Sequence, residues 1–127
     1  MATVHREPNQ VKWVGVRPGH NGEQILIDIL TAVAVVLYTV PADKLLLIFN
    51  YSYSCQPNGA NYAFVQLRNA LDVVYYTLGA SNSAAGASSP VIMANLWVPI
   101  EVPAGHDLYY NVVGTSRGGI HGILIDA

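Results

Sequence analysis

Hydrophobic and polar residues alternate along much of this chain with a period of two. The clearest case is segment 45–54, in which Leu47, Phe49, Tyr51 and Tyr53 share one set of alternate positions and the other set becomes polar towards its end. Because successive side chains of a strand point to opposite faces, this spacing predicts a strand with one apolar face. The same reasoning predicts eight or nine short strands, at 11–16, 24–30, 32–39, 45–54, 62–68, 72–78, 91–102, 107–113 and 120–125.

The phrase Val-Pro-Ala occurs twice, at 40–42 and at 102–104, and an apolar run follows each time. Proline fixes its own φ, lacks an N–H group and drives the preceding residue into the extended region. Each phrase therefore predicts a corner at which one strand ends and the next begins. The polar pairs that follow, Asp43-Lys44 and His106-Asp107, place both corners at solvent-facing ends of the fold.

Turn residues cluster at 17–22, 56–61, 79–90 and 114–119, and the second cluster contains the hairpin signal Asn58-Gly59. No segment has a convincing helical period, although 66–74 could form a helical turn. Strands and turns at this spacing are typical of a two-sheet sandwich or small barrel. We predict an all-β, antiparallel, jelly-roll-like β-sandwich over residues 11–127, preceded by an extended arm at 1–10.

The composition is poor in charge, with 52% hydrophobic and 11% charged residues and a mean hydropathy of +0.33. A typical soluble domain has about 25% charged residues, so we expect much of the surface to be covered by other protein. The net charge is −2 and the six basic residues are dispersed along the chain, which disfavours nucleic-acid binding.

A membrane span is also disfavoured. The longest apolar stretch, 25–40, is interrupted by Asp28, ends at Pro41 and is rich in β-branched residues, whereas a spanning helix needs about 20 apolar residues. The first ten residues lack the apolar core of a signal peptide. The single cysteine, Cys55, is interpreted as a small hydrophobic residue beside a loop.

Candidate catalytic residues are few and scattered. The histidines His5, His20, His106 and His121 lack metal-ligand spacing, and Glu101 is expected to point outward on a half-buried strand. There is no nucleophile elbow and no phosphate-binding glycine loop in a strand-to-helix setting. We therefore predict a protein that is not an enzyme, with no cofactor, no metal and no small-molecule substrate.

Aromatic side chains are the remaining candidates for function. Adjacent tyrosines, as at 75–76 and 109–110, point to opposite faces of a strand, so one of each pair can lie at a surface. Tyrosine and tryptophan are enriched at protein interfaces. The predicted interface residues are Trp13, Val14, Val16, Tyr51, Tyr53, Tyr76, Trp97 and Tyr110, with the arm and the loops 17–24, 55–61 and 79–90 as further contacts.

Three segments resemble known proteins: VPADKLLLIFNYSYS, FVQLRNALDVVYYTLGAS and the ending PIEVPAGHDLYYNVVG with IHGILIDA. Their strand-corner phrasing resembles the small jelly-roll decoration (cement) proteins of tailed bacteriophage capsids. The resemblance covers residues 30–127 and includes no signature residue. It implies a structural virion subunit on the capsid exterior, assembled in the host cytoplasm, that forms a dimer or trimer and binds the major capsid protein.

Two alternatives remain open at this point. One is a carbohydrate- or receptor-binding β-sandwich of a phage tail or fibre, which would present an exposed aromatic platform in a groove. The other is a cupin-like metal enzyme, which would require His106, His121 and an acidic residue to converge on one side of a barrel.

Overall fold

The computed structural model describes residues 22–127, and these residues form nine β-strands and no helix. The strands are β1 (Glu23–Thr31), β2 (Val35–Thr39), β3 (Lys44–Ser54), β4 (Tyr62–Arg68), β5 (Val74–Thr77), β6 (Ser81–Asn82), β7 (Val91–Pro103), β8 (Asp107–Val113) and β9 (Ser116–Asp126). Within this range no helix is long and apolar enough to cross a membrane. The predicted all-β fold is confirmed.

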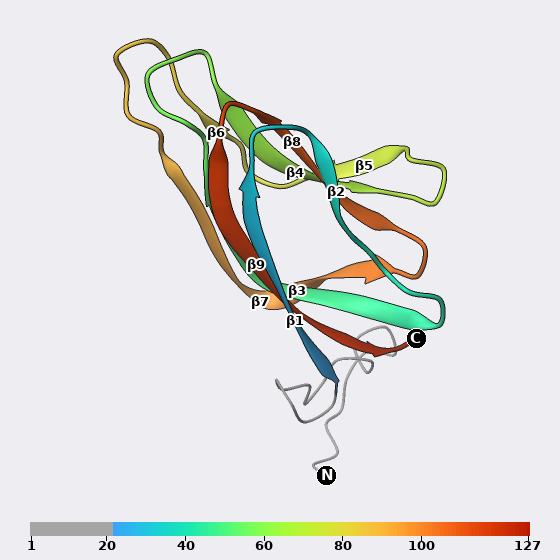
Figure 1. Cartoon of the computed structure of the whole chain (residues 1–127). Coiled ribbons are helices and arrows are strands. Elements are labelled where there is room, and N and C mark those ends of the chain that lie inside the picture. The colour runs from blue at the N-terminus through green and yellow to red at the C-terminus, as the bar shows by residue number, and fades with distance from the viewer. Residues whose placement is uncertain (1–21) are drawn as a thin grey trace.

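The strands form two antiparallel sheets that pack face to face (Figure 1). One sheet has the order β1-β9-β3-β7, and the other has the order β2-β8-β4-β5, with β6 paired to β4. Each strand of the first half pairs with its counterpart from the second half: β1 with β9, β2 with β8, β3 with β7 and β4 with β5. The chain is thus one long hairpin folded over on itself, which is the topology of a jelly roll.

The main core lies between the sheets and is built by the alternation that the sequence shows. In β3, Leu46, Ile48 and Tyr53 face the core, while Leu45 and Leu47 face the other way and join a second buried cluster with Phe49, Ile123 and Ile125. The core positions of the facing sheet include Val65, Leu67, Leu108 and Tyr110. Residues 45–49 of β3 and 123–125 of β9 are therefore apolar on both faces of the sheet.

The two Val-Pro-Ala corners lie side by side. The first joins β2 to β3 and the second joins β7 to β8, and backbone hydrogen bonds link them: Val40 N–H donates to the carbonyl of His106, and Gly105 N–H donates to the carbonyl of Val40, both at 2.9 Å. Asp43 and Gly105, each the residue after Val-Pro-Ala, both have positive φ, of 62° and 80°. The repeated phrase therefore encodes the same tight turn twice, and in each turn the third residue has a positive φ.

The structure differs from the expected element boundaries in three places. The tip at 69–72 forms a hairpin turn rather than a helical turn. Strand β9 begins at Ser116, so Gly118 and Gly119 lie in a strand instead of a loop. The segment 79–90 contains β6, in which the buried Ser81 hydroxyl accepts from the Cys55 N–H at 3.0 Å and donates to the Pro90 carbonyl at 2.6 Å. Hydrogen bonds of Ser81 with a distant residue, Cys55, and with Pro90 thus order a segment that contains few bulky side chains.

Replacement of Gly105 tests the shared corner conformation. A Cβ at this position would meet only the Ala70 Cβ, at 3.8 Å, so Gly105→Ala changes backbone preference and little else. We expect it to lower the free energy of unfolding by about 1 kcal/mol, because a left-handed conformation is costly for alanine. Gly105→Asn should lower the free energy of unfolding by less, since asparagine tolerates the left-handed region. Equal losses for the two variants in chemical denaturation would contradict this account.

Candidate protein interface

Most of the exposed large apolar side chains of the described chain lie on three surfaces. The hairpin surface comprises Leu71, Val73, Val74, Tyr75 and Tyr76, which lie on both faces of the β4–β5 hairpin; the β7 surface comprises Val91, Met93, Trp97 and Val98; and the β1 surface comprises Leu26 and Leu30. The extreme cases are Trp97, which is 99% exposed, and Leu71, which is 83% exposed. Clustered exposed apolar residues of this kind mark interaction sites.

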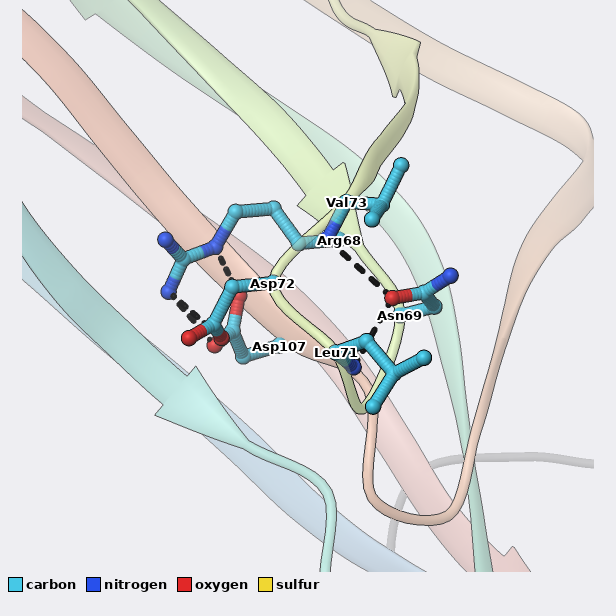
Figure 2. A network of polar contacts seen from close by, with 6 residues as sticks. All are labelled: Arg68, Asn69, Leu71, Asp72, Val73 and Asp107. Atoms are coloured by element: carbon cyan, nitrogen blue, oxygen red, sulfur yellow. Dashed lines mark hydrogen bonds and ion pairs between the residues drawn. The ribbon is translucent and has the colours of Figure 1, made fainter.

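The hairpin surface is carried on a tightly hydrogen-bonded turn between β4 and β5 (Figure 2). The side-chain oxygen of Asn69 accepts hydrogen bonds from the N–H groups of Leu71 and Val73, at 2.9 and 3.1 Å. The Asp72 N–H donates to the Asn69 carbonyl at 2.9 Å, and Asp72 itself has a φ of 61°. A type I turn followed by a left-handed residue is a favoured hairpin connection. The tip is therefore held in one conformation while its apolar side chains face solvent.

Arg68, at the end of β4, fixes this turn to the body of the sandwich. Its Nε and Nη2 donate to the two carboxylate oxygens of Asp107, both at 2.8 Å, and Nη2 lies 3.4 Å from an Asp72 oxygen. The guanidinium also stacks 4.2 Å from the centre of the Tyr109 ring. The hydrogen bond to Asp107 raises the pKa of Arg68. Because the Arg68 and Asp107 side chains are only 15% and 10% exposed, this bidentate pair is partly shielded from water.

The hairpin also contacts the second corner through its tyrosine. The hydroxyl of Tyr75 lies 3.0 Å from Nδ1 of His106, and the two rings meet edge to face with centres 5.3 Å apart. Partial burial, with a smaller contribution from Asp107, raises the pKa of Tyr75. The hairpin surface is thus anchored at both of its strands, by Arg68 on β4 and by Tyr75 on β5.

Trp97 lies at a bulge in β7. Ile48 pairs with Ile100 and Asn50 pairs with Asn95, so a single residue of β3 lies opposite residues 96–99 of β7. The extra residues cannot all pair with β3, and bulges of this kind re-aim side chains. Trp97 continues the exposed alternate positions 91, 93 and 95, whereas after it Val98 is exposed and Pro99 is buried.

A shallow groove of about 320 Å³ runs over the outer face of the sheet that contains β1, β9 and β3. Nδ1 of His121 lies 3.4 Å from the Asn50 amide nitrogen, and its buried Nε2 has no hydrogen-bond partner among the described residues. No aromatic side chain other than the His121 ring lines this groove, so it does not provide a stacking platform for a sugar. Its lining residues are Leu26, Ile27, Asp28, Asn50, Ser52, Gly119, Ile120 and His121.

The structure divides the predicted interface residues into three groups. Trp97 and Tyr76 are exposed, and Tyr51 is half-buried and stacked on Tyr53 with ring centres 5.7 Å apart. The assignment of Tyr53 and Tyr110 to an interface was wrong, because they are 1% and 0% exposed. Trp13, Val14 and Val16 lie outside the described residues.

The two buried tyrosines also satisfy their hydroxyl groups inside the sandwich. The Tyr53 hydroxyl donates to the carbonyl of Gly79, and the Tyr110 hydroxyl forms a hydrogen bond with the hydroxyl of Ser116. Burial raises the pKa of both tyrosines. Tyr110 faces the core because it pairs with Val65 on the core-facing row, and its neighbour Tyr109 therefore takes the outward position.

The residues considered for catalysis are not brought together. His106 contacts Tyr75 at the second corner, His121 lies in the outer groove, and Glu101 is opposite Leu47 on the outer side of β7. Within residues 22–127 no three His, Cys, Asp or Glu side chains are grouped so that they could hold a metal ion. His5 and His20 lie outside the described residues.

Comparison of the sequence with protein-family models and with curated proteins finds no match.

Sequence reasoning missed Leu71, Val73 and Met93 as exposed residues. The run 71–76, Leu-Asp-Val-Val-Tyr-Tyr, resembles a buried strand, and only Asn69 and Asp72 signalled that a turn lay within it. Asparagine and aspartate spaced three apart are a turn signal with a physical mechanism. Met93 shares the period-two pattern of β7, which predicts two faces but does not say which one is covered.

Replacement of Asn69 tests whether the hairpin tip is preorganised. Asn69→Ala removes the acceptor of two backbone N–H groups, so we expect the amide protons of Leu71 and Val73 to exchange with solvent at least about tenfold faster, which corresponds to about 1.4 kcal/mol. Asn82→Ala, at an exposed position in β6, is the matched control and should leave both rates unchanged. Unchanged exchange in Asn69→Ala would show that the turn does not depend on this side chain.

Proposed function

We propose that this chain is a structural subunit of a viral particle, of the capsid decoration type, which binds an assembled shell by protein–protein contact. The jelly-roll topology, the scarcity of charge and the exposed apolar surfaces support this role. In this proposal the protein is not an enzyme, it lies on the capsid exterior, and its partners are the major capsid protein and further copies of itself.

The observation that carries the proposal is the hairpin surface. It exposes five large apolar side chains, on strand β5 and on a turn whose conformation is fixed by Asn69 and anchored by the Arg68–Asp107 pair. A turn whose backbone is already ordered loses little conformational freedom on binding, so more of the burial of its side chains contributes to affinity. We assign the contact with the shell protein to this surface.

The two alternatives receive less support. A carbohydrate-binding module stacks sugars on aromatic rings, yet the groove on the outer face is lined mainly by aliphatic and small polar residues. In a cupin-like enzyme His106 and His121 would share a site, yet they contact Tyr75 and Asn50 respectively.

Leu71 is the residue whose replacement tests shell binding most directly. Virus particles purified from the source of the gene and stripped of this protein by mild denaturant are mixed with the full chain, and binding is measured by co-sedimentation. Leu71→Asp should weaken binding at least about thirtyfold, the effect of losing an interface residue worth about 2 kcal/mol. Thermal unfolding should be unchanged, because Leu71 is 83% exposed.

Val33→Asp is the matched control, since Val33 is an exposed apolar residue in the turn between β1 and β2. It should bind particles as the unmodified chain does. Equal binding by Leu71→Asp and the unmodified chain would contradict the assignment to the hairpin surface. Absence of the protein from purified particles, measured by mass spectrometry, would contradict the proposed function as a whole.

A further inference from the structure

Strand β7 has an unpaired edge. It lies at the end of its sheet, and within residues 22–127 it pairs only with β3 (Figure 1). An edge strand presents a row of backbone N–H and C=O groups that can pair with another chain, and proteins commonly block such edges with charges, proline or bulges. In β7 such devices occur before the strand, at Pro90, and at the bulge in its middle, at 96–99.

These devices leave one short segment free. Pro90, which lacks an N–H group, immediately precedes the strand, and the bulge at 96–99, with Pro99, interrupts the regular ladder. Between them, residues 91–95 pair regularly with β3 and alternate between exposed and half-buried positions. The midpoint of this segment is Met93, which is 68% exposed.

The free segment also lacks charge. Residues 91–100 contain no ionisable side chain, so two copies of this edge can approach without electrostatic repulsion. The opposite edge of the sheet, β1, carries Glu23 and Asp28 and no basic residue. Antiparallel pairing of two β1 strands would bring like charges together, which destabilises a sheet.

We propose that two copies of this chain associate through residues 91–95 of their β7 strands, antiparallel about a two-fold axis at Met93. In this register Val91 of each copy is opposite Asn95 of the other, and the two Met93 side chains meet on the outer face. Trp97, just beyond the pairing, lies against residues 89–91 of the second copy. The two four-stranded sheets then form one continuous sheet across the dimer.

The exposed apolar side chains beside this edge supply the area that such a dimer needs. A tryptophan side chain buries on the order of 200 Å², and each copy adds Trp97, Val98, Met93 and Val91 to the contact. Together with the paired backbone, two such sets approach the ~1,200 Å² of a specific interface. The contact is isologous and closes at two copies.

This inference deepens the proposed function, on whose self-association it rests, by naming the dimer contact. The first test measures the mass of the full chain in solution by light scattering over a wide range of protein concentration. The chain should be a dimer, and Met93→Lys should raise its dissociation constant at least about a hundredfold by placing two like charges at the axis. Leu30→Lys, on β1 of the same sheet and also 68% exposed, should remain dimeric.

A cysteine variant tests the register independently of any loss of stability. Residues directly opposite in antiparallel strands have Cα atoms about 4.5–5.5 Å apart, which suits a disulfide. Met93→Cys should therefore form a covalent dimer on mild oxidation. Leu30→Cys should not, because β1 lies outside the proposed contact, and the unmodified chain should not, because Cys55 is buried.

Three results would overturn the β7 contact: a monomer at all concentrations, a trimer, or a dimer that Met93→Lys does not weaken and Met93→Cys does not cross-link. Particle binding by the hairpin surface is measured separately. Failure of the dimer contact alone leaves shell binding by Leu71 intact, whereas absence of the protein from particles removes the proposed function and leaves the solution dimer standing.

Discussion

The pairing of each early strand with its late counterpart is the constraint on which the rest of this structure depends. Because the chain is one hairpin folded over on itself, both arms must change sheets at the same level of the sandwich. That is why the two Val-Pro-Ala corners lie side by side and share hydrogen bonds between Val40, Gly105 and His106. The corner at His106-Asp107 then meets the hairpin tip through Arg68 and Tyr75, so the corner geometry also positions the exposed apolar side chains.

Much of the fold could be predicted from the sequence wherever local chemistry decides the outcome. The predicted strands at 62–68 and 107–113 coincide with β4 and β8, and proline explains both corners. The prediction was less accurate where a distant partner decides. The start of β9 at Ser116 depends on pairing with Thr31 of β1 and on a 2.7 Å hydrogen bond from the Ser116 hydroxyl to the Ser54 carbonyl. Neither interaction leaves a local signal.

The candidate site shows the same division. Alternation predicts that Tyr109 and Tyr110 face opposite ways, but only the register against β4 decides that Tyr110 faces the core. A one-residue slip would exchange their positions. Residue type alone predicts Trp97 as an interface residue, and the structure places it with 91, 93 and 95 on the outward face of β7, a choice between the two faces that alternation by itself does not make.

The ion pairs among residues 22–127 of this charge-poor chain lie at the ends of strands. Lys44 and Asp126 pair at 2.7 Å where β3 begins and β9 ends, and Arg68 joins Asp107 and Asp72 beside the second corner. Both groups lie at strand ends, so they stabilise corners, and residues 91–100 of β7 carry no charge. A surface pair contributes little stability by itself, but its position decides which apolar areas stay uncharged. The distribution of charge therefore separates the parts of the surface that fix the fold from the parts that can bind protein.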